Sequence, residues 1–156
     1  MGLDRRVRFI GADEVRVDAL VDPAEREREI VRVASRANAT IGAGHHALIY
    51  TSRRLATAIG RAGDLDVARA VSTALVAIVR TIDRRPRFFI AKGGITSSDL
   101  ATKGLGMKQA MVLGQAAPGV PVWRLGGETR FPGMAYVVFP GNVGAPETLR
   151  LLIARL

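Results

Sequence analysis

The segment Phe88–Asp99, which reads FFIAKGGITSSD, decides how this chain folds. An apolar run leads into a double glycine, and three hydroxyl residues and an aspartate follow it. This order predicts a buried strand, a tight turn and the start of a helix. The first amides of a helix have no acceptor within the helix and carry partial positive charge, so they attract phosphate. The segment therefore predicts an anion-binding turn.

Outward from this segment, strand-like and helix-like patterns alternate along the chain. Asp22 and Pro23 predict a helix that runs to about Thr40, because aspartate caps a helix and proline suits its first turn. Asp64 predicts the cap of a second helix, whose apolar face ends near Val79. The other expected elements are strands at 15–20, 46–50, 88–91, 109–114, 120–125 and 136–139, a short helix at 98–105 and a last helix from Pro146.

This alternation favours an α/β fold with helices on both faces of a sheet. The strands after residue 105 follow one another closely, without long helices between them. Antiparallel neighbours are therefore expected beside parallel ones. We predict a three-layer α/β sandwich with a mixed, largely parallel sheet in a single domain.

The composition narrows the possible classes of protein. The 156 residues fit one domain, and a hydrophobic content of 48% is enough for a core. The absence of cysteine excludes disulfides, thiolate metal sites and cysteine nucleophiles. No apolar run approaches the roughly 20 residues of a membrane span. We therefore expect a soluble, cytoplasmic protein.

The net charge of +9 raises the question of nucleic acid. The basic residues are nearly all arginine, are spread along the chain and often stand beside acids, as in Glu25–Glu29. Aromatic residues make up 5% of the chain, too few for an obvious base-stacking platform. Solvated helix faces explain the charge more simply, and nucleic-acid binding remains the third hypothesis.

The first glycine turn offers several groups to a phosphate. Gly93 and Gly94 allow close approach of the backbone, and Lys92 can supply a positive charge. Thr96, Ser97 and Ser98 carry hydroxyl donors, and Asp99 can hold magnesium through water. The alternative is a plain turn followed by a capped helix. The spacing matches neither a Walker A loop nor a GxGxxG fingerprint.

A second turn of similar design follows the strand at 136–139. Gly141, Asn142 and Gly144 can contact the sugar, base or phosphate edge of a nucleotide, although a plain strand-to-helix turn has the same composition. Ligands of open α/β sheets bind beyond the carboxyl ends of the strands. Two such turns side by side would line one anion-binding cleft.

Three blocks of the chain, 92–99, 113–123 and 139–144, resemble the C-terminal nucleotide-binding domain of the four-carbon acid sugar kinases. Their order and their place before the final helix match that family, and the likeness covers nearly the whole chain. The resemblance implies phosphorylation by ATP, with Mg²⁺, of threonate, erythronate or 3-oxo-tetronate at the terminal hydroxyl.

The resemblance also implies site residues. Gly93, Gly94, Ile95, Thr96 and Gly141 fall on the positions that bind ATP. Many relatives carry an acidic residue where this chain has Ile95, and the side chain of isoleucine cannot bind a metal ion. Asp99 is then the acidic residue that could take over the metal role.

The family's substrate-binding N-terminal domain has no counterpart in this chain, and neither do its serine-bearing ATP loop and the strand before it. We therefore expect residues 1–156 to be the nucleotide-binding part alone, partnered in cis or in trans by a substrate domain. The isolated chain should be inactive, and its general base is not predicted. A non-catalytic nucleotide- or sugar-phosphate-binding module is the second hypothesis. An exposed sheet edge could also pair two copies.

Overall fold

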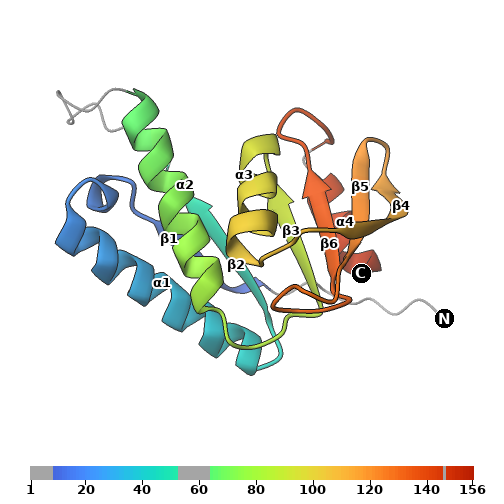
Figure 1. Cartoon of the computed structure of the whole chain (residues 1–156), viewed down its shortest axis with the longest axis horizontal. Coiled ribbons are helices and arrows are strands. Elements are labelled where there is room, and N and C mark those ends of the chain that lie inside the picture. The colour runs from blue at the N-terminus through green and yellow to red at the C-terminus, as the bar shows by residue number, and fades with distance from the viewer. Residues whose placement is uncertain (1–8, 53–63, 146) are drawn as a thin grey trace. The chain divides into compact units, whose positions relative to one another are not determined.

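A computed structural model describes residues 9–52, 64–145 and 147–156, which fall into two compact units, Phe9–Arg85 and Pro86–Leu156 (Figure 1). The first unit contains β1 (Phe9–Val15), a 3-10 turn η1 (Asp18–Leu20), α1 (Pro23–Gly42), β2 (His46–Thr51) and α2 (Asp64–Thr81). The second contains β3 (Phe88–Lys92), α3 (Gly94–Asp99), η2 (Leu100–Gly104), β4 (Ala110–Ala117), β5 (Val120–Leu125), β6 (Ala135–Phe139) and α4 (Thr148–Arg155).

In the first unit, two helices accompany a parallel pair of strands, β1 and β2. The start of α1 is confirmed, because the Asp22 side chain accepts a hydrogen bond from the amide of Glu25 at 2.9 Å and Pro23 opens the helix. The core joins both helices to β1 and η1 through Val15, Leu20, Val33, Ala34, Ala74 and Ile78. The Asp64 side chain lies outside the described residues.

The strand predicted at 15–20 is wrong. β1 ends at Val15, and a 3-10 turn occupies Asp18–Leu20. Val15 and Leu20 are fully buried, so the alternating pattern reflects the burial of one side of a bend rather than an extended strand. The amide of Val17 donates to the hydroxyl of Ser52 instead of to a strand partner.

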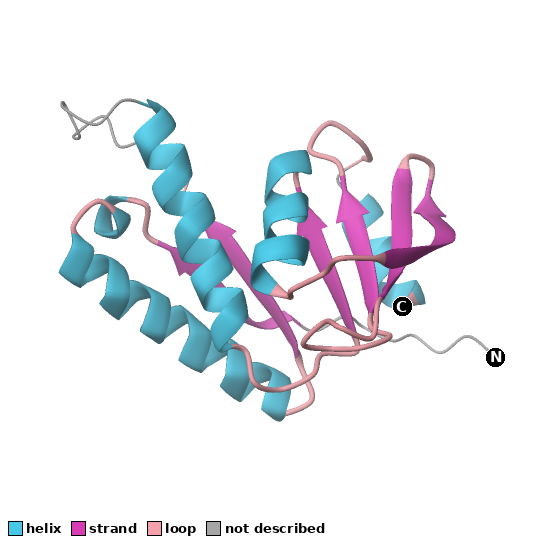
Figure 2. Ribbon diagram, in the orientation of Figure 1, coloured by secondary structure: helices cyan, strands magenta, loops and turns pink. Residues whose placement is uncertain are grey.

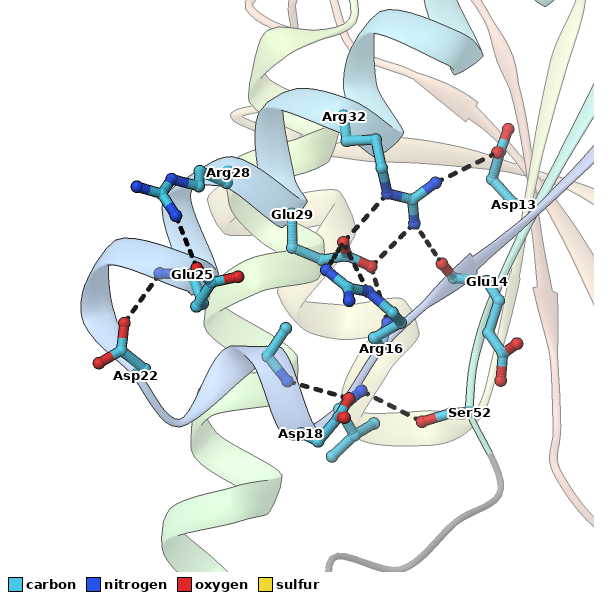
Figure 3. Close-up of polar contacts among 12 residues, drawn as sticks. Asp13, Glu14, Arg16, Asp18, Asp22, Glu25, Arg28, Glu29, Arg32 and Ser52 are labelled. Carbon is cyan, nitrogen blue, oxygen red and sulfur yellow. Dashed lines mark hydrogen bonds and ion pairs between the residues drawn. The ribbon is translucent and has the colours of Figure 1, made fainter.

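A charged network ties α1 to the end of β1 (Figure 3). The buried carboxylate of Glu29 accepts hydrogen bonds from the amide of Arg16 at 2.8 Å and from the guanidinium of Arg32 at 2.8 and 3.0 Å. Arg32 also donates to the carbonyl of Glu14 and, with Arg36, pairs with the buried Asp13. The hydrogen bonds that Glu29 accepts, chiefly those from Arg32, outweigh the opposing effect of burial. They lower the pKa of Glu29 from 4.5 to about 2.

The second unit is a four-stranded sheet in the order β3-β6-β5-β4. β3 and β6 are parallel, whereas β5 runs antiparallel to both β6 and β4. The carboxyl ends of β3 and β6 therefore share one edge of the sheet with the turn between β4 and β5.

Helices cover both faces of this sheet (Figure 2). On one face Tyr136 donates its hydroxyl to the carbonyl of Ser97 in α3. On the other face Val137 packs in a cluster with Leu152 of α4. Because neighbouring strand residues point to opposite faces, α3, the sheet and α4 form three layers within this unit. The predicted α/β class and mixed sheet are confirmed.

The helix predicted at 98–105 begins four residues earlier than expected. Gly94 opens α3, which continues directly into the π-helical turn Leu100–Gly104. The Thr-Ser-Ser run resembled a cap but lies inside the helix, because Gly93 makes the turn by itself with φ at +102°. Pro146, the expected start of the last helix, lies outside the described residues, and α4 begins at Thr148. None of the described helices is both long and apolar enough to cross a membrane.

We predict that Glu29→Gln lowers the free energy of unfolding by about 1–3 kcal/mol at pH 7, because Arg16 and Arg32 lose the charged acceptor that the buried carboxylate provides. Urea denaturation followed by circular dichroism measures this change. The control is Glu25→Gln, which removes an exposed pair with Arg28 and should change stability by less than about 0.5 kcal/mol.

The same comparison across pH tests the charge of Glu29. Its folded-state pKa lies below the unfolded value, so its stabilising contribution is complete above about pH 4.5 and disappears as the pH falls toward 2. The stability difference between the unmodified chain and Glu29→Gln should therefore shrink over that interval. A difference that stays constant down to pH 2 would contradict this account.

Candidate functional site

The two glycine turns lie side by side, as the sequence predicted. The parallel register of β3 and β6 places Lys92 opposite Phe139. Just beyond the strands, the amide of Gly93 donates to the carbonyl of Phe139 at 2.8 Å. The ammonium group of Lys92 donates to the carbonyl of Gly141 at 3.1 Å, so a side chain of one turn contacts the backbone of the other.

The first turn presents backbone amides at the start of α3. The first hydrogen bond of this helix runs from the amide of Ser97 to the carbonyl of Gly93 at 2.9 Å. The amides of Gly94, Ile95 and Thr96 are thus the ones that a helix leaves without an acceptor, and no side chain caps this end. Gly94 and Ile95 are exposed, with Ile95 at 81%, and Thr96 is half-buried. This end of α3 is therefore open to solvent.

Ser97, which the sequence offered as a ligand donor, is buried. Its hydroxyl oxygen lies 2.9 Å from the carbonyl of Ala91 and 2.6 Å from that of Gly93. A hydroxyl has one proton to donate, and these two carbonyls compete for it. The side chain of Ser97 therefore holds the turn together.

Tyr136 is a positioning residue that the sequence did not single out. Its hydroxyl donates to the carbonyl of Ser97 at 2.7 Å, and burial raises its pKa well above the usual value of 10. Its ring stacks on Phe89 and on Trp123 in the neighbouring strands. In the sequence it belonged to a core strand, and nothing there distinguished it from the apolar residues beside it.

Asp99, the predicted magnesium ligand, is half-buried and pairs with Lys103 at 2.7 Å. It lies five residues beyond Gly94, which is about 7.5 Å further along a helix axis. Among the described residues, no group of three or more His, Asp or Glu side chains could hold a metal ion. Any magnesium role of Asp99 thus stays a prediction.

The fold requires a glycine at only one of the two glycine positions of the second turn. Gly144 has φ at +89°, and a Cβ there would lie 3.0 Å from Thr148 and 3.1 Å from Phe139, so the fold itself requires glycine. Gly141 has no such φ, and a Cβ there would meet no atom within 4 Å. Gly141 and Asn142 are both exposed beside Lys92.

Gly94, in the first turn, resembles Gly141 because the space around its Cα is also open. Its φ is not positive, and a Cβ would again meet no atom within 4 Å. Gly93, by contrast, has φ at +102° and is needed for the turn. Each turn therefore joins a glycine that the backbone requires to one that leaves open space, where a ligand can approach the main chain.

We predict that Ser97→Ala lowers the free energy of unfolding by about 1–2 kcal/mol, because it removes a donor from buried carbonyl groups. Thermal unfolding monitored by circular dichroism measures the loss. The control is Ser98→Ala, an exposed neighbour in the same helix, which should change little. Equal stability of the two variants would mean that the Ser97 hydroxyl does not hold the turn.

The chain matches one protein family in sequence and several solved structures in fold. The family described as the nucleotide-binding C-terminal domain matches residues 3–149. The putative tRNA synthase from Salmonella typhimurium LT2 is 18% identical with a TM-score of 0.72, over 90% of this chain and 34% of that chain. A DUF1537 protein from Haemophilus influenzae is 18% identical with a TM-score of 0.71, over 94% and 34%.

A DUF1537 domain from Bordetella bronchiseptica, solved as a domain-swapped dimer with bound citrate, is 19% identical with a TM-score of 0.64, over 90% of this chain and 33% of that chain. No curated protein matches the chain. These identities show a shared fold, and the chain spans about one third of the length of these structures. The family match covers nearly all of the sequence and confirms the resemblance to the sugar-acid kinases: the chain belongs to the family of nucleotide-binding C-terminal domains.

Proposed function

We propose that the two glycine turns bind the polyphosphate of ATP. The observation that carries this proposal is the pairing of an uncapped helix start at Gly94–Thr96 with an exposed second turn at Gly141, joined by Lys92. The free amides supply donors and partial positive charge to phosphate oxygens. Lys92 has further N–H donors beyond the one given to Gly141, so its charge is available beside the same space.

The reaction that this site would serve is transfer of the terminal phosphoryl group of ATP to the terminal hydroxyl of a four-carbon sugar acid. Such transfer depends mainly on positioning and on neutralising charge. The turns would hold the transferred group and the leaving phosphates. A substrate domain, in cis or in trans, would place the sugar acid and its general base.

The described residues do not form a metal site on their own, since none of them belongs to a group of three or more His, Asp or Glu side chains that could hold an ion, and Asp99 is paired with Lys103. Mg²⁺ would therefore arrive bound to the phosphates of ATP and keep much of its water shell. Asp99 is the acidic side chain of this segment that could contact that shell.

We predict that Gly94→Ala and Gly141→Ala each weaken ATP binding at least about tenfold, because a methyl group would occupy the space of the phosphates. Both variants should fold with stability within about 1 kcal/mol of the unmodified chain, since no atom lies in the way. The control is Gly127→Ala, an exposed glycine between β5 and β6 with equally open space. Isothermal titration calorimetry with ATP-Mg measures all three. Unchanged affinity in both turn variants would exclude the proposed site.

The isolated chain should bind ATP without turning it over. At 100 times its dissociation constant, ATP should stabilise the fold by about 2.7 kcal/mol in a thermal-shift assay. Incubation with ATP and threonate, erythronate or 3-oxo-tetronate should give no phosphorylated acid, because neither glycine turn positions the acceptor hydroxyl. Phosphorylation at a rate typical of kinases would contradict the proposal that a separate domain positions the acceptor. ATP binding without turnover, even after a substrate domain is added, would favour the non-catalytic module.

A further inference from the structure

Neither glycine turn contains a carboxylate. Proteins that bind Mg²⁺ together with a phosphate substrate usually hold the ion through one or two carboxylates and the phosphates themselves. The segments 92–98 and 140–145, which form the two turns, contain no Asp or Glu. The acidic residue that follows each turn forms an ion pair: Asp99 with Lys103 at 2.7 Å, and Glu147 with an arginine of α4 at 2.6 Å. The side chains of the two turns therefore do not fit a magnesium ion.

The turns offer hydrogen-bond donors and positive charge instead. The amides of Gly94, Ile95 and Thr96 are those that a helix leaves without an acceptor. The ammonium group of Lys92 lies beside them and donates to the carbonyl of Gly141 at 3.1 Å. Mg²⁺ bridges oxygens of the terminal phosphates of ATP and neutralises part of their charge. A polyphosphate without the metal therefore presents more negative charge and more free oxygens to these donors.

Ile95 occupies the position from which a carboxylate could change this balance most directly. Its side chain is 81% exposed in the first turn of α3. The Cα–Cβ bonds of a helix tilt toward its start, so this side chain leans toward the amides that open the helix. An isoleucine side chain neither attracts a cation nor offsets the partial positive charge of the amides. The first turn of α3 has no acidic residue, so that charge stays available to a ligand.

We propose that the glycine turns bind the metal-free polyphosphate of ATP in preference to its magnesium complex, and that Ile95 determines this preference. The inference rests on the proposed function, and it adds how that site responds to Mg²⁺. Free Mg²⁺ would compete with the turns for the phosphates, so a rise in its concentration would weaken nucleotide binding. Any metal ion that the transfer step requires would take its protein ligands from outside the two turns.

The experiment measures the affinity of the unmodified chain for ATP by isothermal titration calorimetry, in excess EDTA and in excess magnesium chloride at matched ionic strength. We expect ATP to bind at least about threefold more tightly in EDTA, because it then carries about two more negative charges. A smaller ratio, or tighter binding with magnesium, would overturn the inference and leave the phosphate site intact. If ATP bound in neither buffer, the proposed function would fail and the metal preference with it.

Substitution of Ile95 tests its part in the preference. Ile95→Glu should fold, because an acidic residue in the first turn suits a helix, and circular dichroism checks this. Its carboxylate should weaken ATP binding in EDTA at least about tenfold and leave binding with magnesium within about twofold, so that the preference reverses. The matched control is Ile95→Gln, of the same size as Ile95→Glu but uncharged, which should keep the preference for metal-free ATP.

A second control places the same charge elsewhere on the helix. Thr102 is exposed and lies about two turns beyond Ile95, so Thr102→Glu should leave both affinities within about twofold of the unmodified chain. If Ile95→Glu kept the preference of the unmodified chain, or if Thr102→Glu reversed it equally, Ile95 would not be the residue that determines it.

Discussion

The parallel pairing of β3 with β6 is the constraint on which the site depends. Their register brings Lys92 level with Phe139, so both strands end at one edge and both chains must turn there. The Gly93 amide extends this ladder by one hydrogen bond to the carbonyl of Phe139. A slip of one residue would move the strand's side chains to the opposite faces and separate the two turns. The position of the helix start is therefore a consequence of strand register.

A second contact fixes the direction in which that helix leaves the sheet. Ser97 packs its hydroxyl against the carbonyls of Ala91 and Gly93, and Tyr136 donates to its carbonyl from β6. Both contacts are buried, where an unpaired polar group is costly, so the helix has little freedom to tilt. Amides held in this way would need no reordering to receive an anion, and preorganised donors bind more strongly for that reason.

The sequence predicted the adjacency of the turns because a general rule applied: parallel strands end together, and both turns followed apolar runs. It misplaced the start of the helix because Thr96-Ser97-Ser98 has the composition of a cap, whereas Gly93 made the turn by adopting a positive φ. It assigned Ser97 to the ligand because sequence shows chemical groups and not their burial. The strand predicted at 15–20 failed for a similar reason, since burial on one side of a bend imitates alternation.

The glycines show why the motif could be recognised without its parts being understood. Gly93 and Gly144 are required by backbone conformation, and Gly144 also by the closeness of Thr148 and Phe139. Gly94 and Gly141 have no such requirement in the chain by itself. In the sequence all four are simply glycine, although the fold requires two of them and the other two have open space around Cα. Only coordinates separate them, because the difference lies in φ and in the space around Cα. A substitution at the first pair acts on stability, whereas at the second pair it acts on whatever approaches the main chain.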